Sequence, residues 1–333
     1  MERKGIAVAG NILTDNVKMV GTYPEKGMLA TIESESLAVG GCVPNTGIDI
    51  KTLDPEMTVK AFGRVGDDEK GRYVVGKMKA AGLDVSGVII TETQPTSYSD
   101  VITVKGTGER TFFHNRGANK EFCPQDVDLG ALDCKMLHVG YLMLLDYFDK
   151  VRPDGTTPMS DFLKAAQGKG IKTSIDLVSE SSGNFLKVTS AALPYCDYVI
   201  INEVEAGNIA GINPRNENGE VSDESVKGIM QKLIAFGIKE KIIVHCPEKG
   251  YCLDKDGNYT CVPSVKLPKG FIKGSVGAGD CFCAGSLYGI YKGYSDAQTL
   301  RFANLAAISC LSAADSVSGV LHKDKLENLV KGF

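Results

Sequence analysis

Several features that mark other classes of protein are absent from this chain. No run of apolar residues approaches the about 18 that a membrane-spanning helix requires, so we expect no transmembrane segment. The formal net charge of −4 at pH 7 offers no basic surface for nucleic acid. Residues 1–5 lead directly into an apolar stretch at 6–9 without the apolar core of a signal peptide, so we expect a cytoplasmic protein.

Metal-binding and disulfide patterns are also missing. The chain has ten cysteines, but no two of them form a C-x-x-C pair, and its four histidines are scattered singly. In a cytosolic chain of this size most such cysteines are small buried hydrophobic side chains. We therefore expect no structural zinc site.

Two common nucleotide-binding motifs are lacking as well. The glycine-rich stretch at 274–285 is not a G-x-x-x-x-G-K-[ST] loop, and the first apolar strand is not followed by G-x-G-x-x-G. What remains is a chain of 333 residues that is 43% hydrophobic and 23% charged, with 38 glycines. This composition is typical of a soluble, turn-rich globular enzyme, built as one large α/β domain or as two smaller domains.

From about residue 130 onward, apolar strands alternate with helical segments. Such alternation predicts a parallel sheet covered by helices on both faces, with ligand sites at the carboxyl ends of the strands. The expected fold is a three-layer α/β/α sandwich with a mostly parallel central sheet. The expected strands are 136–140, 172–176, 198–202 and 241–246, and the expected helices are 159–169, 185–193, 222–236 and 299–314.

Two stretches depart from this rhythm. Residues 12–38 and 95–117 alternate polar and apolar side chains between turns, and residues 105–109 (KGTGE) have the composition of a hairpin turn. We interpret them as a small antiparallel β-sheet lid on a single α/β domain that spans residues 1–333. A lid that excludes water suits an enzyme that must not waste a nucleotide.

The most informative segment is GSVGAGDCFCAG at 274–285, a tight turn that leads into a helix. The small residues Gly277, Ala278 and Gly279 would let an anion approach the unpaired N–H groups of the helix start. Asp280 is an unusual neighbour for an anion unless it takes a proton from a nucleophile that attacks that anion. Close strand-to-helix packing is the alternative explanation of the glycines, with Asp280 merely complementing the helix dipole.

A second glycine turn, GGCVPN, also enters a helix. Gly40 and Gly41 admit a ligand near the backbone, and Asn45 supplies both a donor and an acceptor. Asn11 and Asp15 follow the first strand, and a carboxylate next to an amide suits the hydroxyls of a polyol. An ordinary capped helix after an Asx turn is the alternative for this group.

Together these segments resemble the ribokinase-like (PfkB) family of carbohydrate kinases over nearly the whole chain. The resemblance rests on the order and spacing of Asp15, the Gly40-Gly41-x-x-x-Asn45 motif, GRVGDD at 63–68 with Gly71, GAN at 117–119, NEVE at 202–205 and GAGD at 277–280. It implies in-line phosphoryl transfer from ATP to a sugar hydroxyl, with no covalent enzyme intermediate.

The resemblance also implies roles for single residues. Asp280 resembles the catalytic base, and Gly277, Ala278 and Gly279 resemble the anion hole for the phosphate oxygens. Asp15, Gly40, Gly41 and Asn45 resemble the sugar clamp, with Asn11 beside it. Further members of the pattern are Asn202 and Glu205, which would organise Mg²⁺ and phosphates largely through water, and Asn304, which would line the adenine pocket.

The chain departs from the family pattern in three places. Gly274 stands where many members have an aspartate that helps to hold a monovalent cation, so a K⁺ requirement is in doubt. The nucleotide strand ends HCPEKG rather than Thr-x-Gly-x-x-Gly, which keeps only Gly250 and raises the question whether His245 contacts phosphate. The strand after His138 lacks the carboxylate of some ribose-specific members, which weakens a specific ribokinase assignment.

Other functions and an assembly remain open at this stage. A nucleoside kinase of the same family is one alternative, with Tyr141 or Phe113 stacking on a base, and a catalytically weak sugar- or nucleotide-binding protein is another. Arg116 could reach a substrate carboxylate or phosphate, although a solvated lid residue is its ordinary interpretation. We also expect a homodimer formed through the lid.

Overall fold

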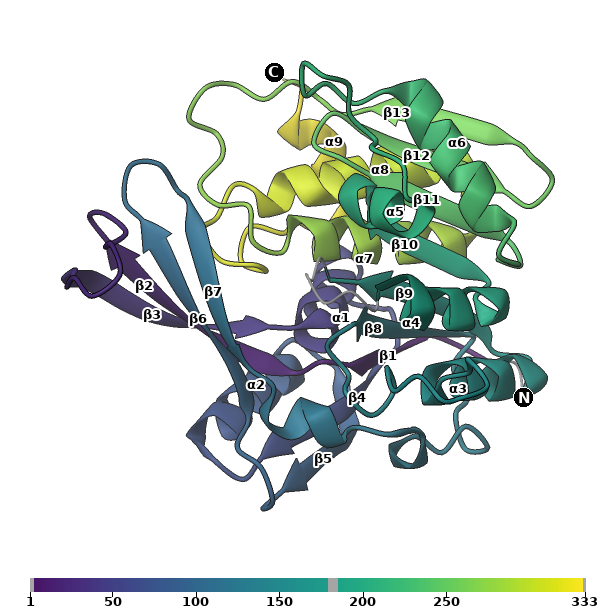
Figure 1. The fold of residues 1–333 in the computed structure, drawn as a ribbon, viewed down its shortest axis with the longest axis horizontal. Coiled ribbons are helices and arrows are strands. Elements are labelled where there is room, and N and C mark those ends of the chain that lie inside the picture. The colour runs from purple at the N-terminus through teal and green to yellow at the C-terminus, as the bar shows by residue number, and fades with distance from the viewer. Residues whose placement is uncertain (1–2, 179–184, 332–333) are drawn as a thin grey trace.

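The computed structural model describes residues 3–178 and 185–331 as a layered body with a smaller sheet projecting from one side (Figure 1). None of the helices in the described part of the chain is both long and apolar enough to cross a lipid bilayer.

The centre of the body is a nine-stranded sheet in the order β13-β12-β11-β10-β9-β8-β1-β4-β5. Neighbouring strands are parallel except at one edge, where β12 and β13 form an antiparallel hairpin on β11. The seven parallel strands are β1 (Ile6–Gly10), β4 (Val59–Gly66), β5 (Asp84–Thr91), β8 (Met136–Leu142), β9 (Lys172–Leu177), β10 (Tyr198–Asn202) and β11 (Lys241–His245), and the hairpin is β12 (Lys249–Asp254) with β13 (Tyr259–Pro263).

Helices cover both faces of this sheet, because the side chains of each strand alternate between two hydrophobic layers. In β1, for example, Ala7 and Ala9 pack in one layer, whereas Ile6 and Val8 pack in the other. The first layer contains α3 (Pro158–Gly168), α4 (Phe185–Ala192), α5 (Glu203–Ala210) and α6 (Asp223–Ile234), and the second contains α1 (Cys42–Leu53), α2 (Glu69–Ala80), α7 (Ala278–Lys292), α8 (Asp296–Cys310) and α9 (Lys323–Leu329). Three short 3₁₀ helices, η1 (Gly117–Glu121), η2 (Pro124–Asp126) and η3 (Leu193–Tyr195), lie in the connections.

The projecting sheet has four strands in the order β3-β2-β6-β7. They are β2 (Leu13–Val20), β3 (Ile32–Gly40), β6 (Ser97–Val104) and β7 (Arg110–Asn115). The pairs β2–β3 and β6–β7 are antiparallel, whereas β2 and β6, which join the two hairpins, are parallel. We call this sheet the lid.

The predicted fold class, a three-layer sandwich with a small additional sheet, is confirmed. The lid itself was predicted to be antiparallel and is instead mixed, because its two antiparallel hairpins join through the parallel pair β2–β6. The predicted strands and helices coincide with β8, β9, β10, β11, α3, α4 and α6 to within two residues at each end. The largest difference is at α8, which begins at Asp296 rather than residue 299 and ends at Cys310 rather than residue 314. The earlier start is explained by Ser295, whose hydroxyl accepts from the N–H of Gln298 while the Gln298 side chain accepts from the N–H of Ser295, so that a capping box fixes this end of the helix.

The strand order explains where a ligand site should lie. The chain runs from β1 to β4 and β5 on one side, and then returns to place β8, β9, β10 and β11 on the other side of β1. The connections therefore diverge between β1 and β8, and a crevice opens at the carboxyl ends of two strands that separate in this way. Asn11 and Tyr141 lie at this point.

Candidate active site

The glycine cradle forms the N-terminus of α7, as the sequence predicts. Gly277 is the N-cap residue, with φ of 78°. A Cβ atom at this position would lie 2.5 Å from the carbonyl oxygen and Cβ of Ser316, so any side chain would clash here. The turn packs tightly on residue 316. Gly277 and Gly279 line the two adjoining cavities, and the first N–H groups of a helix have no partner within it.

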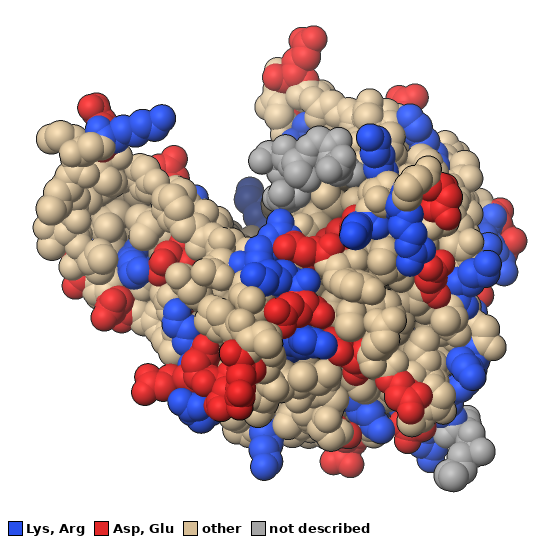
Figure 2. All heavy atoms as spheres, turned by 60° about the horizontal axis from the view of Figure 1, so that its bottom comes forward, with Lys and Arg blue, Asp and Glu red and all other residues tan. Residues whose placement is uncertain are grey.

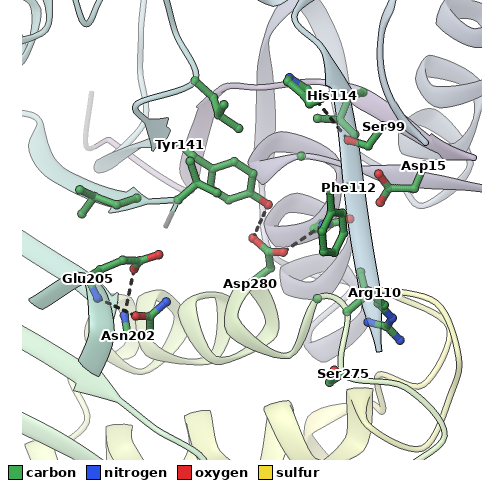
Figure 3. Close-up of a pocket in the computed structure, with 18 of the residues that line it drawn as sticks. Asp15, Ser99, Arg110, Phe112, His114, Tyr141, Asn202, Glu205, Ser275 and Asp280 are labelled. Atoms are coloured by element: carbon green, nitrogen blue, oxygen red, sulfur yellow. Dashed lines mark hydrogen bonds between the residues drawn. The ribbon is translucent and has the colours of Figure 1, made fainter. Parts of the chain in front are cut away.

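Asp280 lies in the first turn of α7, and its carboxylate accepts two hydrogen bonds from residues that are distant in sequence. The Tyr141 hydroxyl donates to Oδ1 at 2.8 Å, and the Asn45 side-chain amide donates to Oδ2 at 3.0 Å (Figure 3). Burial is the main reason that the pKa of Asp280 rises from 3.8 to about 7; the Asp176 carboxylate acts in the same direction, and the two hydrogen bonds oppose it. A carboxylate with a pKa near neutrality can accept a proton from a hydroxyl at physiological pH.

Asn45 is held by the start of α1. Its N-cap residue, Gly41, has φ of 91°, and a Cβ atom there would lie 2.5 Å from the carbonyl oxygen of Asn11. The Asn45 side-chain oxygen accepts a hydrogen bond of 2.9 Å from the Ser316 hydroxyl, which fixes the amide with its N–H₂ group toward Asp280. The second glycine turn and the cradle are therefore joined by one chain of hydrogen bonds.

Asp15 faces the same cavity from lid strand β2. Burial raises its pKa from 3.8 to about 7, against the effects of a hydrogen bond with Ser99 and the positive charge of Arg110. The Ser99 hydroxyl also lies 3.1 Å from Nδ1 of His114. Gly40 packs against the Asp15 carboxylate, since a Cβ atom at Gly40 would lie 2.6 Å from its Oδ2.

These groups line a cavity of about 930 Å³ between the lid and the body, visible as a hollow beside the projecting lobe (Figure 2). A smaller cavity of about 150 Å³ continues inward, and Tyr141, Asn202, Glu205 and Asp280 line both. The arrangement places two carboxyl groups, the Asn45 amide and a helix N-terminus around one space, a combination that suits phosphoryl transfer.

Asn202 and Glu205 form a capping box at the start of α5. The Asn202 side chain accepts from the N–H of Glu205 at 2.8 Å, and the Glu205 carboxylate accepts from the N–H of Asn202 at 3.1 Å (Figure 3). The motif thus has a structural role of its own. Both residues also line the cavities, and together with Asp280 they offer the oxygen donors that Mg²⁺ prefers.

The residues expected near the nucleotide lie in three different settings. His245, at the end of β11, lines the smaller cavity. The centroid of its ring lies 4.6 Å from that of the Phe282 ring. Burial lowers the pKa of His245 to about 4, so the imidazole is neutral at pH 7. Asn304 is buried on α8, where its amide donates to the carbonyl of Val262 at 3.3 Å. Gly250 is buried on β12, where an added Cβ would meet Phe282 and Leu300.

Asn11 and Gly274 also make close contacts within the protein. Asn11 is fully buried: its Oδ1 accepts from the N–H of Tyr141 at 2.6 Å, and its amide donates to the carbonyl of Leu144 at 3.1 Å. It therefore joins the ends of β1 and β8 beneath the cavity. Gly274 faces the carbonyl oxygens of Ala313 and Ala314, which a Cβ atom would approach to 2.9 and 2.8 Å.

Cys42, His138 and Asp176 form a buried group that local sequence patterns did not indicate. Their potential ligand atoms lie within 4.8 Å of one another, and His138 Nε2 is 3.5 Å from Asp176 Oδ2. The three residues come from α1, β8 and β9, so only the fold brings them together. Their immediate consequence for the site is electrostatic, because Asp176 lines the inner cavity and raises the pKa of Asp280.

Sequence reasoning missed two further contributions to the site. Tyr141 donates its hydroxyl to Asp280 rather than simply presenting a ring, and Arg110 reaches the cavity from β7. Period-two alternation along 110–115 would have placed Arg110 on the same face as His114, but it does not say which face meets a cavity. Arg116, by contrast, donates to Asp146 Oδ1 and to the carbonyl of Met143, both at 2.9 Å.

Comparison with known proteins identifies the family and the fold. A family model described as pfkB family carbohydrate kinase matches residues 4–320. The chain is 24% identical to a ribokinase of Schizosaccharomyces pombe over 336 residues (98% of each chain) and 22% identical to a 5-dehydro-2-deoxygluconokinase of Geobacillus thermodenitrificans over 305 residues (88% of this chain and 84% of the relative). In fold it is similar to the structure of Arabidopsis thaliana ribokinase complexed with ribose and ATP, with a TM-score of 0.81, 19% identity and 99% of each chain covered.

Proposed function

Because the chain belongs to the pfkB family of carbohydrate kinases, which transfer phosphate to an alcohol group, we propose that it transfers the γ-phosphate of ATP to a hydroxyl of a small sugar or sugar derivative. The observation that carries this proposal is the position of Asp280. Its carboxylate lies at the N-terminus of α7, accepts a hydrogen bond from Asn45 and lines the same cavity as Asp15.

In the proposed reaction the protein works by positioning and electrostatics. Asp15 and Asn45, with the Gly40–Gly41 turn, bind sugar hydroxyls, and Asp280 accepts the proton of the hydroxyl that attacks the γ-phosphorus in line. The N–H groups of Gly277, Ala278 and Gly279 stabilise the charge on the phosphate oxygens as it develops. The shared cavity and the raised pKa of Asp280 support these roles.

Asn202 and Glu205 would hold Mg²⁺ and the phosphates, mainly through water. When bound, Mg²⁺ would neutralise charge on the phosphates. Neutral His245, beside Gly279, can donate one ring N–H to a phosphate oxygen; a Cβ added to Gly279 would lie 3.5 Å from its Cε1. Gly250 and Asn304 are placed on the adenine side of the nucleotide in this proposal.

The relatives suggest more than one substrate, since their names refer to ribose and to a deoxygluconate derivative. A nucleoside is the second candidate, because Tyr141 brings an aromatic ring to the cavity, and Phe112 does so in place of the expected Phe113, which alternates to the other face of β7. Measuring ATP consumption against pentoses, hexoses, keto-acid sugars and nucleosides tests the proposal. Turnover of at least one sugar is expected, whereas turnover of nucleosides alone favours the second candidate, and no turnover with retained sugar binding indicates a binding protein.

We further propose that residues 1–333 act as one domain with the four-stranded sheet as its lid, and that the chain forms a homodimer through this lid. The support is a set of exposed apolar side chains on the lid strands and the loop between β2 and β3. They are Met28, Leu29, Ile32, Leu37 and Phe113.

A further inference from the structure

Lid strand β7 presents three consecutive same-face side chains to the cavity. Side chains alternate along a strand, so Arg110, Phe112 and His114 share one face of β7, and all three line the 930 Å³ cavity together with Asp15 and Asp280. Figure 3 shows them along β7 beside Asp15, Asp280 and Ser275. The strand therefore brings one cation, one ring and one imidazole to the space that the substrate would occupy.

The guanidinium of Arg110 has no carboxylate partner. Six of the eight arginines in the chain form an ion pair with an aspartate or glutamate, whereas the Arg110 guanidinium makes no hydrogen bond or ion pair with any other residue that the structure describes. The six paired residues are Arg64, Arg72, Arg116, Arg152, Arg215 and Arg301.

Arg110 is also partly withdrawn from solvent. Burial lowers its pKa, and only the charge of Asp15, which lies too far away for a salt bridge, opposes this effect. Arginine is the residue best suited to bind a carboxylate or phosphate, because its planar guanidinium donates two parallel hydrogen bonds. An unpaired, half-buried guanidinium at a ligand cavity is therefore a site for an anion.

The cation on β7 is distinct from the groups that bind hydroxyls. Asp15, Asn45 and Asp280 suit hydroxyls, and none of them attracts an anion, so a negatively charged group of the substrate would be drawn toward Arg110 and away from the two carboxylates. Arg116, the other lid-end arginine, is already bonded to Asp146 and Met143. His114 contributes no charge at neutral pH, because burial lowers its pKa.

We infer that the substrate is an anionic sugar, carrying a carboxylate or a phosphate that Arg110 binds from the lid. This inference rests on the proposed function, since it names the substrate class of the same site. It also gives the lid a role in recognition, because the guanidinium that would distinguish an acidic sugar from a neutral one lies on β7 and lines the cavity.

The test compares matched pairs of substrates: uronic acids against their parent hexoses, gluconate and its keto derivatives against glucose, and ribose 1-phosphate against ribose. For the wild type we expect kcat/KM on the best anionic sugar to exceed that on its neutral counterpart by about 10- to 100-fold, the usual effect of a hydrogen-bonded charge pair. Comparing the carboxylate-bearing sugars with the sugar phosphate shows which anion is preferred.

Variants assign the effect to Arg110. Arg110→Gln should raise KM for the anionic sugar about 10- to 100-fold more than it raises KM for the matched neutral sugar, and Arg110→Lys should be intermediate because it keeps the charge but loses the paired hydrogen bonds. Lys105→Gln is the matched control, since this exposed lid cation pairs with Glu33. Circular dichroism and thermal melting establish that each variant is folded.

Three results would overturn the inference: a neutral sugar as the best substrate with a KM that Arg110→Gln does not change, a rise in KM for ATP instead of for the sugar, or an equal effect of Lys105→Gln. Titration calorimetry of the same sugars separates this failure from failure of the kinase proposal. Binding of anionic sugars that depends on Arg110, without turnover, would contradict the kinase proposal and uphold the anion site.

Discussion

At the scale of single residues, the behaviour of Asp280 follows from opposing effects on its proton affinity. Burial and the Asp176 charge favour the protonated form, and the hydrogen bonds from Tyr141 and Asn45 favour the carboxylate. The balance leaves the pKa of Asp280 at about 7. A carboxylate with this pKa is partly deprotonated at neutral pH and is also basic enough to accept a proton from a hydroxyl. Small changes in its neighbours should therefore appear directly in the pH dependence of turnover.

Replacing Tyr141 with phenylalanine tests this balance. The change removes a hydrogen bond that lowers the pKa of Asp280, so the pKa should rise and activity should be lost at a higher pH on the acid side of the profile. The measurement is kcat/KM from pH 5 to 9. The exposed Tyr147 provides the control, Tyr147→Phe, which should leave the profile unchanged; an acid limb that stays in place in Tyr141→Phe would mean that this bond does not tune the base.

At the scale of elements, the N-terminus of α5 combines two functions in one motif. The bonds between Asn202 and Glu205 cap the helix, and the same side chains face the cavity where we propose that Mg²⁺ binds. Capping alone would explain the pair, so evidence for metal binding must come from a change that preserves the cap.

Glu205→Gln is such a change. Glutamine at this position can still accept from the N–H of Asn202, so thermal stability should be nearly unchanged, whereas loss of the charge should raise the Mg²⁺ concentration needed for half-maximal activity about tenfold. Glu205→Ala, which also removes the cap bond, should in addition lose about 1 kcal/mol of stability. If Glu205→Gln has wild-type Mg²⁺ dependence, Glu205 serves the helix cap only.

The elements also show how far local sequence information reaches. The small residues at 277–279 and Asp280 are predictable because a tight turn, a helix start and a carboxylate are encoded within a few residues. The hydrogen bonds of Asn11 beneath the cavity, the contact of Asn304 with β13 and the reach of Arg110 depend on packing between distant segments. For these three residues the sequence shows which side chain is present, but it does not show which distant segments that side chain contacts.

At the scale of the whole molecule, the lid sheet combines a recognition face with exposed apolar surface. The Ile32 side chain, on edge strand β3, is 47% exposed, and Leu29 before it is 88% exposed. Exposed apolar surface on a sheet edge favours association with another chain. The proposed homodimer would cover this surface.

Light scattering coupled to size-exclusion chromatography measures the assembly. The wild type should have twice the chain mass of 35.6 kDa, and Ile32→Glu should shift it toward the monomer because a charge would be buried at the interface. Ile90→Glu is the matched control, since Ile90 is 61% exposed on β5, outside the lid. A monomeric wild type, or equal effects of both variants, would rule out a lid-mediated dimer.

The central claim is that Asp280 is the base of a sugar kinase, and Asp280→Asn tests it most directly. With the best sugar of the panel, turnover should fall about 10²- to 10⁴-fold, while ATP affinity by titration calorimetry stays close to the wild type. The variant should remain folded, and its stability relative to the wild type should be greater at pH 8 than at pH 5. The reason is that the raised pKa of Asp280 makes the wild type lose stability as the carboxylate ionises between about pH 4 and pH 7, whereas asparagine does not titrate. Asp128→Asn, on an exposed turn, should change neither activity nor ATP affinity. Near-normal turnover in a folded Asp280→Asn enzyme would contradict the account.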